Sequence, residues 1–445
     1  MKPTKLKKML LIVAGLFIGA SSAQAQEVVL KAELGTPVVA AGARQTAFLK
    51  VSLTGFLLQG RGDRTPANIA IVLDQSGSMQ GAKLERAKEA AIMAVDLLND
   101  SDIVSIVSYD TTVQVIVPAT PVRDKAEIRR AIQRMRADGS TALFAGVSKG
   151  AREVRKYMDG ERVNRVILLS DGQANVGPRS ATELGELGMS LGKEGISVTT
   201  IGLGAGYNED LMTSLAGYSD GNHAFVDNAD DLARIFSYEF GDVLSVVAQD
   251  LVIRIELKEG VRPMRLLGRD GEIFGSTVTT RLNQLYSDQE KYVMLEVEVP
   301  EGATGQLRDL ADVEVSYQNM ANQQKERLND RVQVSYSASQ QAVQQALVPS
   351  VVSTATRQVA NEASKQALEL RDKGQTQAAQ KVLQESASYV REQAAALGGA
   401  EGAMLESFSD DVDQEAKAVV ESEDWNRARK SIKAKQYKLE KQQKY

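Results

Sequence analysis

A short motif with one carboxylate and two hydroxyls stands at residues 74–78, in the order Asp-Gln-Ser-Gly-Ser. The apolar run Ile71-Val72-Leu73 leads directly into it and is typical of a buried strand. In open α/β sheets, ligands bind just beyond the carboxyl ends of the strands. The Asp74 carboxylate and the hydroxyls of Ser76 and Ser78 can therefore be directed at one place, and such oxygen atoms are the ligands that hard cations prefer.

The segments around this motif have the pattern of a doubly wound α/β domain. Four apolar segments are bounded by polar turns, as strands buried on both faces of a parallel sheet should be. They are Ile69 to Leu73, Ile103 to Val107, Val163 to Leu169 and Ile196 to Leu203. One helical face between the first two is formed by Leu84, Ala87, Ala91, Val95 and Leu98. The alternation predicts a mostly parallel sheet with helices on both faces, over residues 67–247.

Outside this region the apolar period changes to two, which is typical of antiparallel strands with one wet face. The inward positions are Leu49, Val51 and Leu53 before it, and Leu251, Ile253, Ile255, Leu257, Val313, Val315, Tyr317, Val332, Val334 and Tyr336 after it. The strands upstream of the α/β domain are too few to bury a hydrophobic core by themselves. We therefore predict one β-sandwich, made from residues 26–66 and 248–337, into which the α/β domain is inserted.

The region 338–445 is rich in Ala, Gln, Glu and Lys, and its composition predicts helices. Gly374 and the pair Gly398-Gly399 mark breaks between them. We expect a helical hairpin packed on itself or on the sandwich; the alternative is an arm that binds a partner or drives oligomerisation. The basic and polar segment from Lys430 to Tyr445 is expected to fray.

Together these features resemble a von Willebrand factor type A domain, the fold also found in integrin I domains. The metal-ion-dependent adhesion site of that family combines Asp-x-Ser-x-Ser with a threonine of a later loop and an aspartate at the end of another strand. The matching residues are Thr141, in Gly-Ser-Thr-Ala, and Asp171, in Leu-Ser-Asp-Gly. The resemblance covers about Asn68 to Leu244. It implies that a metal ion is held, directly or through water, by Asp74, Ser76, Ser78, Thr141 and Asp171.

A plainer interpretation of the same residues is that Ser76, Ser78 and Asp171 only cap helices, as these residue types often do. The full set of five matches argues against this interpretation, because the residues occur in the family's order within an α/β pattern. A site of hydroxyls and carboxylates without His or Cys favours Mg²⁺ or Mn²⁺, with Ca²⁺ as a further candidate, over Zn²⁺ or copper. In the family, an open coordination position accepts a Glu or Asp carboxylate of a protein partner, and the resemblance implies such a partner here.

The N-terminus has the pattern of a secretory signal peptide, predicted as residues 1–25. Four lysines, at positions 2, 5, 7 and 8, precede the apolar run Met9 to Ile18, and Ala23-Gln24-Ala25 has the form of a cleavage site. An uncleaved anchor is the alternative, but the run is shorter than the roughly 20 residues that span a bilayer. The protein is therefore expected to be periplasmic or secreted. Without cysteine it has neither disulfides nor a cysteine-linked lipid.

Charge and histidine content exclude several functions. The formal net charge of −5 becomes about −9 once the four signal-peptide lysines are removed, which argues against nucleic acid as a partner. The one histidine, His223, is expected on or beside a terminal strand of the sheet as a structural residue, so a Ser-His-Asp or Cys-His enzyme has almost no candidates. We interpret Arg61-Gly62-Asp63 as a surface turn and predict that the chain is not an enzyme.

The sequence thus predicts an exported adhesion or scaffold protein that docks a partner through a cation-bridged carboxylate. The alternative is a structural subunit of a cell-envelope assembly or stress-response complex, in which the ion mainly stabilises the fold. A third hypothesis, a part of a metal-dependent enzyme complex of the kind in which type A domains assist ATPases, fits export poorly because ATP is scarce outside the cytoplasm.

Overall fold

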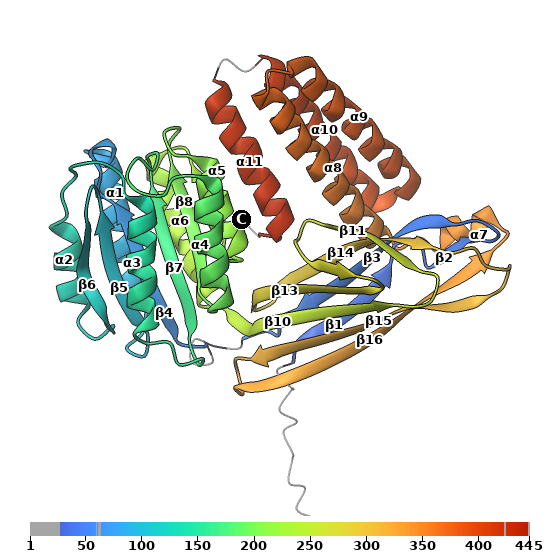
Figure 1. Cartoon of the computed structure of the whole chain (residues 1–445), viewed down its shortest axis with the longest axis horizontal. Coiled ribbons are helices and arrows are strands. Elements are labelled where there is room, and N and C mark those ends of the chain that lie inside the picture. The colour runs from blue at the N-terminus through green and yellow to red at the C-terminus, as the bar shows by residue number, and fades with distance from the viewer. Residues whose placement is uncertain (1–26, 59, 61–63, 422–423, 444–445) are drawn as a thin grey trace, which may run out of the picture.

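The structure is a computed structural model that describes residues 27–58, 60, 64–421 and 424–443. It has three parts: an α/β domain, a β-sandwich and a set of C-terminal helices (Figure 1). The predicted signal peptide and the Arg61-Gly62-Asp63 tripeptide lie outside the described residues, so both remain predictions. None of the helices within these ranges combines the length and apolar character that crossing a membrane requires.

The α/β domain is built on a six-stranded sheet in the order β6-β5-β4-β7-β8-β9. Five strands are parallel: β4 (Ala67–Asp74), β5 (Ile103–Tyr109), β7 (Val163–Ser170), β8 (Ser197–Leu203) and β9 (His223–Val226). The sixth, β6 (Val113–Pro121), runs antiparallel to β5. All residues of β4, β5, β7 and β8 are buried, so the prediction of strands covered on both faces is confirmed.

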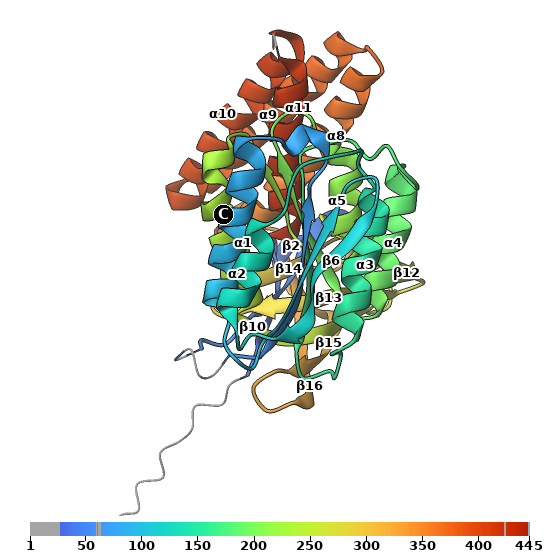
Figure 2. The ribbon, with the colours of Figure 1, turned by 90° about the vertical axis from the view of Figure 1, so that its left-hand side faces the viewer.

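Three helices cover each face of this sheet. On one face, Ile69, Ile71 and Leu73 of β4 share a core with α1 (Ala82–Leu97), α2 (Lys125–Gln133) and α6 (Leu232–Val243). On the other, Ala70 and Val72 pack with α3 (Leu143–Arg155), α4 (Ala181–Lys193) and α5 (Glu209–Tyr218). Figure 2 shows α1 and α2 on one side and α3 and α4 on the other. The domain is therefore doubly wound, as the sequence predicts.

The β-sandwich consists of two sheets, β1-β3-β14-β11 and β12-β13-β10-β15-β16-β2. Its strands are β1 (Val29–Leu34), β2 (Val38–Ala40), β3 (Gln45–Thr54), β10 (Val246–Leu257), β11 (Arg262–Leu267), β12 (Glu272–Phe274), β13 (Thr277–Tyr286), β14 (Glu290–Val299), β15 (Leu307–Asn319) and β16 (Gln324–Ser337).

Strands from both sides of the α/β domain pair within this sandwich. Upstream β3 runs antiparallel to downstream β14, with Val51 opposite Val293, and β2 pairs with β16. Only residues 244 and 245 separate α6 from β10. The inward side chains of β3, β10 and β14 form one core. This pairing confirms the prediction of a sandwich with an inserted α/β domain.

The C-terminal region is helical, with α7 (Gln340–Gln345), α8 (Pro349–Asp372), α9 (Thr376–Leu397), α10 (Gly399–Glu421) and α11 (Trp425–Lys441). Helices α8, α9 and α10 pack on one another around residues such as Leu383 and Val412. Helix α8 also rests on the sandwich, because Val351 and Ala355 share a small core with Met294. The helices therefore pack both on themselves and on the sandwich.

The last helix departs from the expectation that the chain frays from Lys430. Helix α11 lies between the other C-terminal helices and the α/β domain (Figure 1). Lys430 is buried and pairs with Glu209 of α5 at 2.8 Å, and Arg429 pairs with Asp210 at 3.1 Å. The fraying prediction is wrong for residues 430–441, because the basic charge that suggested a solvated tail is neutralised by acids of the α/β domain.

A buried polar network joins the α/β domain to the sandwich. The guanidinium of Arg165 in β7 is fully buried and donates to the Tyr286 hydroxyl (2.8 Å) and to Gln284, both in β13. On its other side Arg165 donates to Thr199 Oγ1 at 3.1 Å. Thr199 in turn donates to the carboxylate of Glu239 in α6 at 3.1 Å, and the Arg165 and Glu239 charges lie 4.0 Å apart.

This network predicts a pH dependence of stability. Burial, reinforced by the negative charge of Asp242, raises the pKa of Glu239 from 4.5 to about 7, although Arg165 opposes the shift. The folded chain therefore binds a proton on Glu239 between pH 4.5 and 7 that the unfolded chain does not bind, so this group makes the fold less stable as pH rises through that window. Across this pH window the free energy of unfolding falls by about 3 kcal/mol because of this group.

Glu239→Gln removes this dependence. We expect the stability of the variant, relative to the unmodified protein, to improve by up to about 3 kcal/mol between pH 5 and pH 8. Urea denaturation midpoints measured at pH 5, 6, 7 and 8 check this, since other titrating groups cancel in the difference between the two proteins. If the midpoints of the two proteins differ by the same amount at pH 5 and pH 8, the predicted pH dependence is contradicted.

Candidate metal centre

The two aspartates of the predicted site come from neighbouring parallel strands. Asp74 is the last residue of β4, and Asp171 directly follows β7, which pairs with β4 so that Leu73 lies opposite Leu169. Both side chains are buried. Because the strands are parallel and in register, the two carboxylates meet at the same edge of the sheet.

The loop after β4 links these carboxylates through its two serines. The Ser76 backbone N–H donates to Asp74 Oδ1 at 2.8 Å, which folds the loop back over the strand end. The Ser76 and Ser78 hydroxyl oxygens lie 3.1 Å apart, and Ser78 Oγ donates to Asp171 Oδ1 at 2.7 Å. Ser76 begins a short 3₁₀ turn, but its side chain makes no capping hydrogen bond. The hydroxyls are therefore directed at the carboxylates rather than used as helix caps.

The fifth residue, Thr141, reaches the same place from the loop before α3. Asn175 fixes this loop, because its Oδ1 accepts a hydrogen bond from the Thr141 backbone N–H at 2.8 Å. A Cβ atom added to Gly172 would lie 3.3 Å from Thr141 Oγ1 and 3.4 Å from Ser78 Oγ, so both hydroxyls flank one point. The structure thus brings all five predicted residues together around one end of the sheet.

A cavity of about 650 Å³ opens beside these groups. Its lining includes Ser78, Thr141 and Asp171, together with Arg179 and Asn208 from neighbouring loops. An outside ligand can therefore approach the Ser78 and Thr141 hydroxyls from solvent, with the buried Asp171 directly beside them.

The electrostatics of the two aspartates favour a cation at this edge of the sheet. Burial raises the pKa of Asp74, as does the nearby Asp171, whereas hydrogen bonds from Ser76 and Ser170 lower it. Ser170 Oγ donates to Asp74 Oδ2 at 2.7 Å. The Asp74 carboxylate is thus costly to keep ionised without a positive partner, a condition that a bound cation relieves.

The donor set suits a hard cation. It offers carboxylate and hydroxyl oxygens, which Mg²⁺, Mn²⁺ and Ca²⁺ prefer, and no sulfur or imidazole nitrogen. In the described part of the chain, no cluster of three or more His, Cys, Asp or Glu side chains could hold a metal. A cation at this edge would depend on the hydroxyls of Ser76, Ser78 and Thr141 and on water, in addition to the two carboxylates.

Several residues of the site are not evident from the motif. The Tyr109 hydroxyl, at the end of β5, lies 3.3 Å from Asp74 Oδ2, and burial and the Asp74 charge raise its pKa well above 10, so it remains a donor. Asn175 holds Thr141 in place. The Lys83 ammonium in the first turn of α1 contacts Asp171 Oδ2. The sequence could have indicated that Tyr109 lies near Asp74, since both residues end neighbouring strands, β5 and β4.

His223 has no part in this site. It lies on β9, the edge strand, as the sequence predicts. Its ring nitrogens lie 2.9 Å from Thr200 Oγ1 and 3.4 Å from the Tyr207 hydroxyl. Burial and nearby lysines lower its pKa to about 3, so it is neutral at physiological pH.

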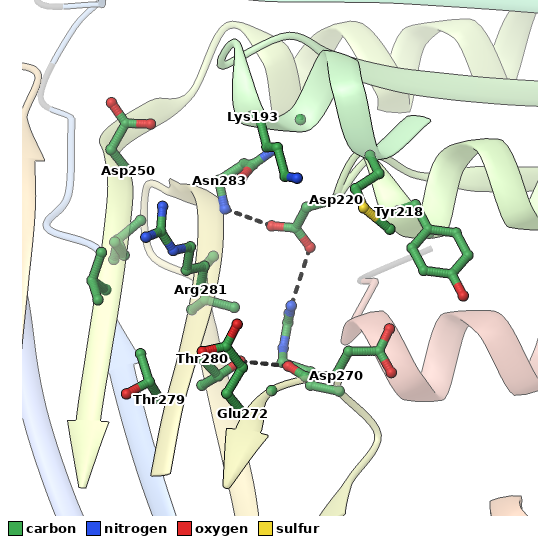
Figure 3. Close-up of a pocket in the computed structure, with 18 of the residues that line it drawn as sticks. Lys193, Tyr218, Asp220, Asp250, Asp270, Glu272, Thr279, Thr280, Arg281 and Asn283 are labelled. Atoms are coloured by element: carbon green, nitrogen blue, oxygen red, sulfur yellow. Dashed lines mark hydrogen bonds and ion pairs between the residues drawn. The ribbon is translucent and has the colours of Figure 1, made fainter. Parts of the chain in front are cut away.

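A second cavity, of about 680 Å³, lies between the α/β domain and the sandwich (Figure 3). It shares no lining residue with the cavity at the candidate metal centre. Asp220, at its centre, accepts a hydrogen bond from the Asn283 backbone N–H at 2.7 Å and pairs with Arg269 at 3.1 Å (Figure 3). These groups join the two domains, which accounts for their burial without a ligand.

Comparison with known proteins agrees with the fold. The von Willebrand factor type A domain family matches residues 68–237. The protein sll0103 of Synechocystis sp. is 28% identical over 292 residues, which cover 62% of this chain and 69% of that protein. YfbK of Escherichia coli is 28% identical over 48% of this chain, but only 37% of its own length is matched.

A solved structure shows the same overall arrangement. The von Willebrand factor type A protein from Catenulispora acidiphila superposes with a TM-score of 0.68 over 90% of this chain and 91% of its own, at 16% identity. At this identity the likeness shows the fold alone. The family match, the sheet order and the Asp-x-Ser-x-Ser loop all fall on the same segment, and residues 68–237 therefore form a von Willebrand factor type A domain.

Proposed function

We propose that this protein is an exported, non-enzymatic binding protein that docks an acidic residue of a protein partner at a divalent cation held by Asp74, Ser76, Ser78, Thr141 and Asp171. Type A domains act in general in protein interaction or adhesion. The observation that carries the proposal is the convergence of two buried carboxylates and three hydroxyls beside one open cavity. A bound Mg²⁺ or Mn²⁺ would supply the positive charge that a partner's Glu or Asp carboxylate requires.

The chain's own residues have distinct tasks in this proposal. Asp74 and Asp171 supply negative charge to retain the cation, and the hydroxyls of Ser78 and Thr141 supply neutral oxygens on the cavity side. Ser170 and Tyr109 lie behind Asp74 and keep its carboxylate oriented. Two of the five predicted ligands are carboxylates and three are neutral hydroxyls, so an octahedral ion would keep coordination room for a further carboxylate from a partner.

Capture of partners with and without chelator tests the proposal. The immobilised protein is incubated with cross-linked envelope extract of the source cell in Mg²⁺, in EDTA, and in EDTA followed by excess Mg²⁺. We expect captured proteins to disappear in EDTA, to return with Mg²⁺, and to be absent with Asp171→Asn. Asp230→Asn, which alters an exposed carboxylate of the same domain, is the matched control and should capture normally.

Capture that survives both EDTA and Asp171→Asn would contradict docking through a cation. It would favour the alternative, a structural subunit of an envelope assembly in which the ion mainly stabilises the domain. Circular dichroism of Asp171→Asn shows whether lost capture reflects lost folding.

A further inference from the structure

The Lys83 ammonium occupies one oxygen of the Asp171 carboxylate. Lys83 lies in the first turn of α1, immediately after the serine loop, and its Nζ contacts Asp171 Oδ2. The other oxygen, Oδ1, accepts the hydrogen bond from Ser78 at 2.7 Å. Both oxygens of this carboxylate are therefore engaged by the chain's own donors.

The two members of this ion pair have unequal surroundings. The Asp171 side chain is 0% exposed, whereas the Lys83 side chain is 40% exposed. A lysine can move its charged head to water at low cost when its stem is near the surface, but a buried carboxylate without a cation is costly. The ammonium can thus leave readily, provided that another cation takes its place.

Lys88, five residues further along α1, offers a contrast. Its side chain is 5% exposed and pairs with Glu85 at 2.8 Å. The helix therefore carries one lysine fixed in the fold and one positioned between solvent and the site.

We propose that Lys83 is a built-in competitor for the divalent cation, paired with Asp171 in the metal-free protein and displaced to solvent when the ion binds. This inference rests on the proposed function and describes its regulation. Without metal, the Lys83 ammonium neutralises the charge of the buried Asp171 carboxylate. Because the metal ion must displace this ammonium, the free energy of metal binding is less favourable than it would be without Lys83. Affinity is thereby kept low enough for the ion, and the partner that depends on it, to exchange.

Calorimetric titration with MgCl₂ tests this competition in the full chain. Lys83→Gln removes the charge at similar length and should tighten Mg²⁺ binding about tenfold, the scale of one charge-assisted contact. Lys83→Arg retains a cation and should bind like the unmodified protein. Lys193→Gln, at an exposed lysine outside the site, is the matched control and should change nothing. Unchanged or weaker binding by Lys83→Gln would overturn the inference.

Amine labelling of the unmodified protein gives a second readout that does not depend on a variant. An acetylating reagent followed by mass spectrometry reports the reactivity of each lysine. We expect Lys83 to react several-fold faster in Mg²⁺ than in EDTA, because its ammonium is released from the ion pair, while Lys193 reacts equally in both. An unchanged or slower reaction of Lys83 in Mg²⁺ would also overturn the inference.

The outcomes separate this inference from the proposed function. If the unmodified protein binds no Mg²⁺, the proposed function fails and the inference with it. If it binds Mg²⁺ but neither the affinity of Lys83→Gln nor the labelling of Lys83 changes, only the competitor role is excluded.

Discussion

Replacing Asp74 with alanine is expected to weaken Mg²⁺ binding at least about 100-fold. The change removes one of only two carboxylates at the site, and a hard divalent ion depends on anionic oxygens for most of its affinity. It also removes the acceptor of the Ser76 N–H bond that orders the serine loop. The loss of Mg²⁺ affinity should therefore be larger than that expected from removing one ligand alone.

Calorimetric titration of the two proteins after chelation measures this effect. Asp230→Asn, at an exposed site of the same domain, should keep full affinity. Because Asp74→Ala also leaves the Ser170 hydroxyl without its acceptor, we expect a loss of about 1 to 3 kcal/mol in stability, and circular dichroism must show that the variant is folded. Equal affinity of Asp74→Ala and the unmodified protein would refute the assignment of the site.

Replacing Arg165 with methionine should destabilise the protein by about 3 to 5 kcal/mol at pH 8, as expected when one partner of a buried charge pair is removed. Gln284 and the Tyr286 hydroxyl lose a buried donor, and Glu239 loses a cation 4.0 Å away. The cost should be smaller at pH 5, where Glu239 is already protonated in the folded chain.

Urea denaturation at pH 5 and pH 8 checks this expectation. The double variant Arg165→Met with Glu239→Gln should be more stable at pH 8 than Arg165→Met alone, because it leaves no unpaired carboxylate. The exposed Arg281 of β13 provides the matched control, and Arg281→Met should shift the midpoint little. An Arg165→Met midpoint equal to that of the unmodified protein at pH 8 would contradict the structural role of the network.

The arrangement of the candidate metal centre follows from local sequence to a large extent. Parallel strands end at the same edge, so an aspartate at the end of one strand and another just past the end of its neighbour must meet once the strand order is known. The α/β alternation and the change to a period of two likewise predict the two domains. That Thr141 joins the site required the resemblance, because a lone threonine in a loop carries no local signal.

Contacts between distant segments could not be predicted. Arg165 is a charged residue within an apolar strand, which signals a buried partner, but Gln284 and Tyr286 lie about 120 residues later in another domain. Lys83 resembles any solvated lysine at the start of a helix, and Asp171 is 88 residues away. The basic residues of α11 suggested a free tail because their acidic partners lie on α5. In each case the pairing depends on how the three parts pack.

The two-residue passage from α6 into β10 has a mechanical consequence. β10 is an interior strand of its sheet, held by an antiparallel ladder to β13 on one side and to β15 on the other. If a captured partner pulls on the type A domain, tension transmitted along β10 acts across these ladders in shear, so many hydrogen bonds share the load at once instead of opening one after another. The connection is thus suited to a tether that must hold under force.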